Sequence, residues 1–215
     1  MKAYIFDMDG TLFRTNTILE KALEETFQHL REKDSWSGET PIEQYREIMG
    51  VPLPVVWKTL LPMHSETMHE EVDLYFLYRL IALIKSGQGA LYTGVEELFE
   101  ELRQSGSLFI ASNGKKEYLK AIVDYYQLDR WVTETFSIEQ IQSLNKSDLV
   151  RTIIEKYTVT SGAMVGDRLS DIKAGKENGL FSVGCHFDFA HEDELAQADL
   201  VIRDFKELTS TLKAN

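Results

Sequence analysis

Short apolar runs that stop at glycines or polar turns constrain the fold of this chain most. Each run is too short for a helix and long enough for a buried strand, and helical patterns separate most of the later runs. The apolar runs span 3–6, 108–111, 163–165, 180–183 and 200–202, and the helical patterns about 94–105, 116–127, 146–157 and 170–178. Strands that alternate with helices predict a doubly wound, Rossmann-like α/β domain with a parallel sheet.

The segment 14–92 has a different pattern. It carries long amphipathic repeats, such as the one from Ile18 to Leu30, and it contains all 4 prolines of the chain. Because proline interrupts helices, this segment is expected to form several short helices and no strand. We therefore predict a helical domain at 14–92, inserted into a core domain made of residues 1–13 and 93–215.

Charge and cysteine content exclude several classes of function. With 23 Lys+Arg against 35 Asp+Glu, the net charge is −12, which argues against nucleic acid and anionic membranes as partners. The most apolar long stretch, 72–84, is too short to span a bilayer. Cys185 is the single cysteine, so no intrachain disulfide can form. We expect a cytoplasmic protein, and a monomer or a homodimer fits the composition equally.

The first apolar run ends in Asp7-Met8-Asp9-Gly10-Thr11. On a strand, residues two apart point the same way, so Asp7 and Asp9 are expected to face one pocket. Two close carboxylates repel each other unless a cation or a proton lies between them. Gly10 allows a positive φ and a close approach of the backbone to a ligand. The simpler alternative is an acidic turn that caps a helix.

Three further polar groups follow expected strand ends or open expected helices. They are Ser112-Asn113-Gly114, then Lys146, then Gly166-Asp167 with Asp171. Taken singly, each has an ordinary explanation: a turn, a surface lysine or an acidic helix start. Because parallel strands present their carboxyl ends at one edge, the groups are expected to form one site. Clustered carboxylates select a hard cation, and Mg²⁺ is the one we expect.

In this order, the motifs resemble the four signatures of the haloacid dehalogenase superfamily. The likeness is to its phosphatases with a helical cap, in the branch of phosphoglycolate phosphatase and β-phosphoglucomutase. The resemblance implies a sheet order of 3-2-1-4-5, dependence on Mg²⁺, and a small phosphorylated metabolite as substrate. Asp9 argues against the reaction that names the family, since cleavage of a carbon–halogen bond needs no protonation of the leaving group.

The resemblance also implies a role for each residue. Asp7 would attack phosphorus and form an aspartyl-phosphate, while Asp9 would act as general acid and then general base. The implied metal ligands are Asp7, the backbone carbonyl of Asp9, Asp167 and, in or just behind the shell, Asp171. The implied phosphate-binding residues are Thr11, Ser112, Asn113 and Lys146.

In the inserted domain, Arg46 and the loop at Gly50 are the candidates for substrate specificity. The alternative for Arg46 is a surface helix arginine. Three functions stay open at this point. The first is a phosphatase acting on phosphoglycolate, a sugar phosphate or a nucleotide. The second is a phosphomutase in which a bound sugar phosphate accepts the phosphoryl group. The third is a phospho-aspartate switch without turnover.

Overall fold

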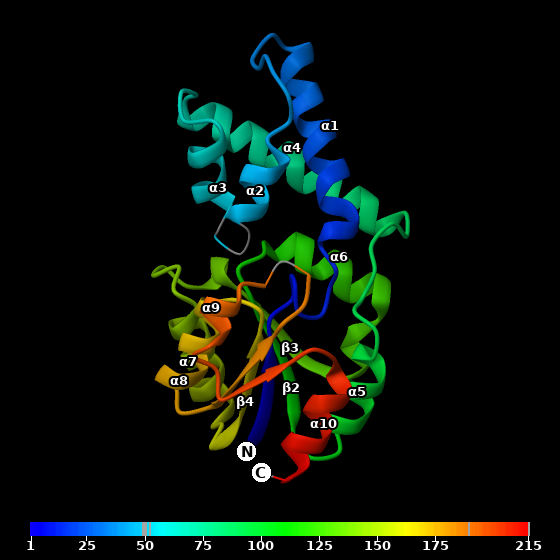
Figure 1. Cartoon of the computed structure of the whole chain (residues 1–215), viewed down its shortest axis with the longest axis vertical. Coiled ribbons are helices and arrows are strands. Elements are labelled where there is room, and N and C mark those ends of the chain that lie inside the picture. Colours follow the sequence, from blue (N-terminus) through cyan, green and yellow to red (C-terminus); the bar gives the residue numbers. More distant parts are fainter. Residues whose placement is uncertain (49–50, 52, 189, 215) are drawn as a thin grey trace. The chain divides into compact units, whose positions relative to one another are not determined.

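The computed structural model describes residues 1–48, 51, 53–188 and 190–214 (Figure 1). The chain divides into two compact units. The core unit is Met1–Arg14 with Leu91–Asn215, and the insertion unit is Thr15–Ala90.

A six-stranded sheet forms the centre of the core unit. Its strands are β1 (Lys2–Phe6), β2 (Ser107–Ser112), β3 (Val132–Ser137), β4 (Ser161–Gly166), β5 (Phe181–Cys185) and β6 (Leu200–Ile202). They lie in the order β3-β2-β1-β4-β5-β6, and every neighbouring pair is parallel. The predicted order 3-2-1-4-5 is confirmed, and β6 extends the sheet beyond β5.

Helices cover both faces of this sheet. They are α5 (Val95–Leu102), α6 (Lys116–Tyr126), α7 (Lys146–Tyr157), α8 (Leu169–Glu177), α9 (Glu192–Leu195) and α10 (Phe205–Ala214). Two short 3₁₀ turns, η1 (Leu128–Arg130) and η2 (Ile138–Gln140), flank β3. Figure 1 shows α7 and α8 on one side of the sheet, and α5 and α10 on the other. The prediction of a doubly wound α/β domain is therefore confirmed.

The central strand β1 is buried on both faces. Ala3 and Ile5 belong to one apolar cluster with Leu149 and Ile153 of α7. Side chains alternate along a strand, so Phe6 points to the opposite face, where its ring centroid lies 5.2 Å from that of Phe99 on α5. This two-sided burial explains why the run at 3–6 is apolar at every position.

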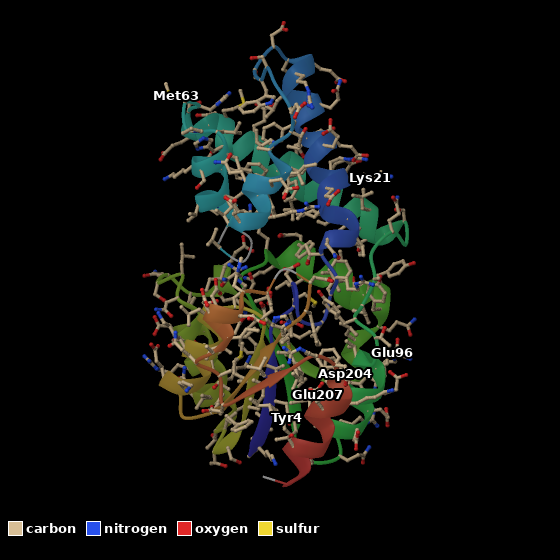
Figure 2. The ribbon with its side chains drawn as sticks, viewed as in Figure 1. Tyr4, Lys21, Met63, Glu96, Asp204 and Glu207 are labelled. Carbon is tan, nitrogen blue, oxygen red and sulfur yellow. The ribbon has the colours of Figure 1, made fainter. Side chains whose placement is uncertain are left out.

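Helix α5 shows how the outer layer meets solvent. Its apolar residues Val95, Leu98, Phe99 and Leu102 are buried at helical spacing. The four glutamates between them are not part of this buried stripe, and Glu96 points outward in Figure 2.

The strand β3 is absent from the apolar runs of the sequence. Its middle residues Thr133, Glu134 and Thr135 are polar, and only its ends are buried. It lies at the edge of the sheet beside β2, where only one of its two neighbouring positions is filled by a strand. A sequence pattern based on apolar runs therefore missed one strand out of the six.

The insertion unit is built from α1 (Asn16–Glu32), α2 (Ile42–Glu47), α3 (Leu53–Leu60) and α4 (Glu66–Lys85). Its described residues contain no strand, as the pattern predicted. Trp57 is fully buried and donates its indole N–H to Asp73 Oδ1 at 2.8 Å, which joins α3 to α4. Met63, in the turn between them, is 93% exposed (Figure 2). Within the described parts of the chain, no helix is both long and apolar enough to cross a bilayer.

Candidate active site

The loop after β1 is held together by hydrogen bonds to the backbone carbonyl of Met8. Met8 O accepts hydrogen bonds from the N–H groups of Leu12 at 2.9 Å and Phe13 at 2.8 Å, and Gly10 N donates to Phe13 O at 3.0 Å. Because β1 ends at Phe6, Asp7 and Asp9 follow the strand and do not lie on it. The argument from strand alternation was therefore wrong for this pair, and the tight loop determines where each carboxylate points.

Two glycines leave room for the acidic residues. Gly10 has a φ of 73°, and a Cβ there would stand 2.3 Å from Asp167 Oδ2. A Cβ on Gly166 would lie 2.2 Å from Asp171 Cγ. Any larger residue at either position would displace a carboxylate, because no room is left for a side chain. At Gly10 the positive φ also favours glycine.

Three carboxylates meet at the carboxyl ends of β1 and β4. Asp7, Asp167 and Asp171 are all buried, and each offers an oxygen within 4.8 Å of the others. Thr11 Oγ1 donates to Asp167 Oδ1 at 3.2 Å, and the N–H of Arg168 donates to Asp171 Oδ2 at 3.0 Å. Asp167 precedes α8 and Asp171 lies in its first turn, so two residues four apart in the sequence contribute to the same cluster.

Lys146 adds one cation to this cluster. It is the first residue of α7, which Asn145 caps by accepting a hydrogen bond from Ser147 N at 2.8 Å. The ammonium nitrogen lies 2.8 Å from Asp7 Oδ1 and 2.5 Å from Asp171 Oδ1. The side chain is almost fully buried, so the interpretation as a surface lysine is wrong.

The electrostatics of the cluster follow from burial. Burial alone would lower the pKa of Lys146, but the charges of Asp171 and Asp7 outweigh it and raise the pKa above its usual value. Burial, together with repulsion from Asp7 and Asp171, raises the pKa of Asp167 well above its usual value. Burial also raises the pKa of Asp171 to about 6, although Lys146 opposes the shift. The site as described therefore disfavours the charged forms of Asp167 and Asp171.

The donor set fits a small, hard cation. Mg²⁺ binds oxygen at about 2.1 Å, so ligands across its shell stand about 4.2 Å apart. Three carboxylate oxygens within 4.8 Å of one another match that size. Among the described residues, no other group of His, Cys, Asp and Glu comes together in this way.

The turn after β2 lies at the same edge of the sheet. Ser112 is the last residue of β2, is almost fully buried, and accepts a hydrogen bond from Gly114 N at 3.0 Å through its hydroxyl. Asn113 sits between them and is half-buried. Ser137, at the end of β3, donates its hydroxyl to Gly114 O at 2.7 Å and holds the turn from the neighbouring strand.

Asp9 has a partner that the sequence patterns did not reveal. Its Oδ1 accepts a hydrogen bond from the phenol of Tyr118, on α6, at 2.5 Å. Its carboxylate is not one of the three that cluster, which leaves the expected metal contact of Asp9 to its backbone carbonyl. No motif joins positions 109 residues apart, so only the fold could show this contact.

The candidates in the insertion unit have local partners. Arg46 pairs with Glu20 and, at 2.5 Å, with Glu43 of its own helix. Gly50 lies outside the described residues. The role of Arg46 in substrate specificity stays a prediction.

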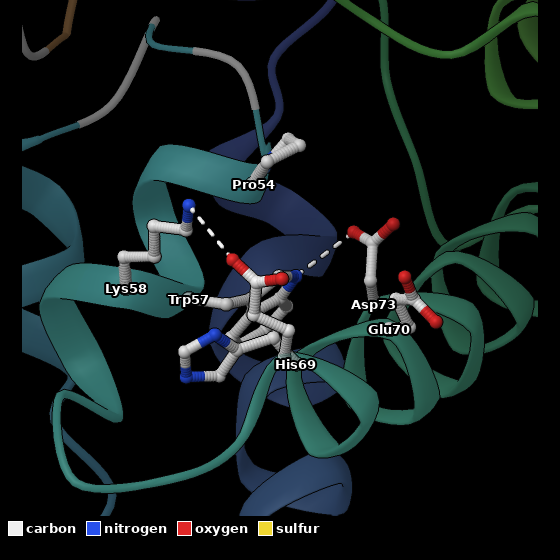
Figure 3. Close-up of a pocket in the computed structure, with 7 residues that line it drawn as sticks. Pro54, Trp57, Lys58, His69, Glu70 and Asp73 are labelled. Atoms are coloured by element: carbon white, nitrogen blue, oxygen red, sulfur yellow. Dashed lines mark hydrogen bonds and ion pairs between the residues drawn. The ribbon is translucent and has the colours of Figure 1, made fainter.

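A separate pocket of about 240 Å³ lies within the insertion unit, between α3 and α4 (Figure 3). Trp57 and His69 form part of its wall, and Lys58 spans one side of it, 3.5 Å from Glu66. Three of its lining residues are acidic, Glu66, Glu70 and Asp73, and none of the residues that form the buried carboxylate cluster lines it.

Known proteins share both the sequence pattern and the fold. A phosphoglycolate phosphatase of Agrobacterium fabrum is 27% identical over 97% of this chain and 91% of its own length. The pyrophosphatase PpaX of Listeria monocytogenes is 22% identical over 97% of this chain and 95% of its own. The crystal structure of CbbY from Rhodobacter sphaeroides in complex with phosphate has a TM-score of 0.84 at 21% identity and covers 99% of both chains. The family model of haloacid dehalogenase-like hydrolases matches residues 1–179, so this chain is an enzyme of that family.

Proposed function

We propose that this enzyme is a Mg²⁺-dependent phosphatase that hydrolyses small phosphomonoesters through an aspartyl-phosphate on Asp7. One observation carries the proposal: the buried oxygens of Asp7, Asp167 and Asp171 converge within 4.8 Å, with the ammonium of Lys146 at Asp7. The names of similar proteins, phosphoglycolate phosphatase and pyrophosphatase, support chemistry at phosphorus.

The first step transfers the phosphoryl group to the enzyme. A carboxylate oxygen of Asp7 attacks phosphorus as the bond from phosphorus to the leaving-group oxygen breaks. Asp9 gives its proton to that oxygen, and an alcohol departs. In the second step, Asp9 takes a proton from water as the water oxygen attacks the phosphorus of the aspartyl-phosphate. Inorganic phosphate then leaves, and the Asp7 carboxylate is restored.

The surrounding residues hold the substrate and the cation. Asp7, Asp167, Asp171 and the carbonyl of Asp9 would hold Mg²⁺, whose charge stabilises the phosphoryl oxygens in the transition state. Ser112, Asn113 and Lys146 would contact those oxygens. Thr11 was expected to bind phosphate, but its hydroxyl donates to Asp167 Oδ1 at 3.2 Å, so we propose instead that it orients this carboxylate.

The insertion unit would act as the cap that contacts the leaving group. In this part of the proposal, Arg46 contributes a positive charge toward the substrate. Its ion pairs with Glu20 and Glu43 would then have to loosen or be shared when the substrate binds.

The test is phosphate release from p-nitrophenyl phosphate, phosphoglycolate, glucose 6-phosphate and a nucleoside monophosphate. We expect turnover with Mg²⁺ and none with EDTA. Asp7→Asn should lose at least about 10³-fold in kcat, since the nucleophile is gone. The exposed Asp129→Asn is the matched control and should keep full activity.

Three results would overturn the proposal. Activity that survives in Asp7→Asn would remove the nucleophile. Activity that requires a bisphosphate primer would indicate a phosphomutase. A stable phospho-Asp7 without phosphate release would indicate a switch.

A further inference from the structure

The hydrogen bond from Tyr118 to Asp9 joins two segments of the core unit that are remote in sequence. The phenol oxygen of Tyr118 lies 2.5 Å from Asp9 Oδ1, and the tyrosine is only 5% exposed. Asp9 belongs to the loop after β1, whereas Tyr118 belongs to the first turn of α6, which follows the turn at Ser112. One contact therefore connects the loop that follows the proposed nucleophile to the helix that follows the turn proposed to hold phosphate.

The ring of Tyr118 has close neighbours in the core unit. It packs edge-on against Phe13, with centroids 6.5 Å apart and an interplanar angle of 80°. Phe13 is fully buried and its backbone N–H donates a hydrogen bond to Met8 O, so it is fixed within the loop that carries Asp9. Gly114 also lies close to it, since a Cβ on Gly114 would stand 3.1 Å from a carbon of the Tyr118 ring. The phenol is thus placed by packing and has little freedom to leave Asp9.

A general acid must present its proton along a defined direction. A free carboxyl group rotates about its Cβ–Cγ bond, and errors of about 1 Å in placing a catalytic group cost up to about 10²-fold in rate. A buried phenol that donates to one carboxyl oxygen removes this rotation. It also makes the two oxygens of Asp9 inequivalent, because Oδ1 accepts a hydrogen bond from Tyr118.

We propose that Tyr118 is the positioning residue for Asp9: its phenol fixes Oδ1 and turns Oδ2 toward the oxygen of the leaving group. This inference rests on the proposed function. In the transfer to Asp7, the proton on Oδ2 moves to the leaving oxygen as the bond to phosphorus breaks. In the hydrolysis, Oδ2 takes a proton from the attacking water. The phenol keeps its own proton throughout.

Leaving groups of different basicity separate this role from a structural one. p-Nitrophenolate departs without protonation, whereas an alkoxide needs the proton from Asp9. The ratio kcat/KM reports the steps up to the departure of the leaving group. Losing the phenol should therefore lower kcat/KM for an alkyl phosphate and leave it nearly unchanged for p-nitrophenyl phosphate.

The experiment compares Tyr118→Phe with wild type on β-glycerol phosphate and p-nitrophenyl phosphate at saturating Mg²⁺. We expect kcat/KM to fall about 10-fold or more on β-glycerol phosphate and less than 2-fold on p-nitrophenyl phosphate. The matched control is Tyr126→Phe, which removes a hydroxyl from the same helix, next to the same Phe13. It should change neither value.

A double-mutant cycle completes the test. In the Asp9→Asn background, Tyr118→Phe should have no further effect on β-glycerol phosphate, because the residue acts only through Asp9. An equal loss on both substrates, or an unchanged loss in that background, would overturn the inference. A wild-type enzyme inactive on both substrates and on every member of the phosphatase panel would overturn the proposed function itself, whereas an active wild type without the selective loss would overturn only the role of Tyr118.

Discussion

Lys146 and Asp171 form a buried ion pair, with the ammonium nitrogen 2.5 Å from Asp171 Oδ1 and neither side chain more than 3% exposed. The same nitrogen also lies 2.8 Å from Asp7 Oδ1. One cation therefore serves two carboxylates, and the third, Asp167, lies beside them without a lysine or arginine ion pair among the described residues.

Replacing Lys146 should lower stability as well as activity. Lys146→Met leaves Asp7 and Asp171 buried without their cation, and we expect a loss of about 3 kcal/mol in the free energy of unfolding. Urea unfolding in EDTA measures it. The exposed Lys120→Met, which breaks a surface pair with Asp124, is the control and should change stability by less than about 0.5 kcal/mol.

The cause can be checked with a second substitution. Adding Asp171→Asn to Lys146→Met should recover part of the loss, since one of the uncompensated charges is then gone. If Lys146→Met alone resembles the surface control, the buried pair contributes little to folding.

Without metal, Asp167→Asn should stabilise the protein. The pKa of Asp167 is raised well above its usual 3.8, so its charged form is disfavoured in the folded state. Stability should therefore fall as the pH rises from about 4 through the folded-state pKa, and asparagine should remove this loss. In EDTA at pH 7 we expect the melting temperature to rise by about 2–4 °C.

Added Mg²⁺ should reverse that order. The wild type should gain thermal stability because the cation compensates its carboxylates, whereas the variant has lost a ligand and should gain less. The melting temperatures of both proteins, measured at increasing Mg²⁺ concentration, test this prediction. A wild type that does not respond to Mg²⁺ would contradict the assignment of the cluster as a metal site.

Asp199 should make stability sensitive to acid. Its carboxylate accepts from Ser182 Oγ at 2.6 Å and from Ser182 N at 2.8 Å, and these bonds hold its pKa below the usual 3.8. A lowered pKa means that the stabilisation is present above pH 4 and is lost as the pH falls through the folded-state pKa. Asp199→Asn should cost about 1 kcal/mol at pH 7. The difference from wild type should shrink below pH 4 in urea titrations; a difference independent of pH would contradict the assignment.

Thr158 ends α7 in a conformation that suits glycine. Its φ of 52° and ψ of 49° are left-handed, which is unfavourable for a β-branched residue. Thr158→Gly should stabilise the protein by about 0.5 kcal/mol, after the entropy cost of glycine in the unfolded chain. Thr152→Gly, inside the same helix, should instead destabilise by about 0.4 kcal/mol, the difference between the helix propensities of threonine and glycine. Equal losses in both variants would show that the cap conformation carries no strain.

Much of the candidate site could be predicted because its residues follow strands in short motifs. Asp7, Ser112 and Asp167 each stand at or just past the carboxyl end of a buried strand. Apolar runs reveal such strands, and parallel pairing brings their ends together. Lys146 could be placed at a helix start, but its burial between two carboxylates depends on how α7 packs and was not visible in the sequence.

The features that could not be predicted are contacts between residues that are far apart in the sequence. The edge strand β3 has a polar centre, and Glu134 there is covered by Lys156 and Tyr157 of α7. The bonds from Tyr118 to Asp9 and from Thr11 to Asp167 join residues more than 100 positions apart. Neither has a local pattern, because the residues meet only after the sheet has formed.

The two points where the insertion joins the core unit are bonded to each other, and we call this pairing of residues 12–13 with residues 91–92 the seam. Tyr92 N donates to Leu12 O at 3.0 Å, and Phe13 pairs with Leu91 as an antiparallel bridge. The core fold thus fixes the ends of the insertion independently of what lies between them. A sequence of another length could be exchanged at this seam without shifting the register of any strand, which makes the seam a natural boundary for modular replacement during evolution or for building chimeric enzymes.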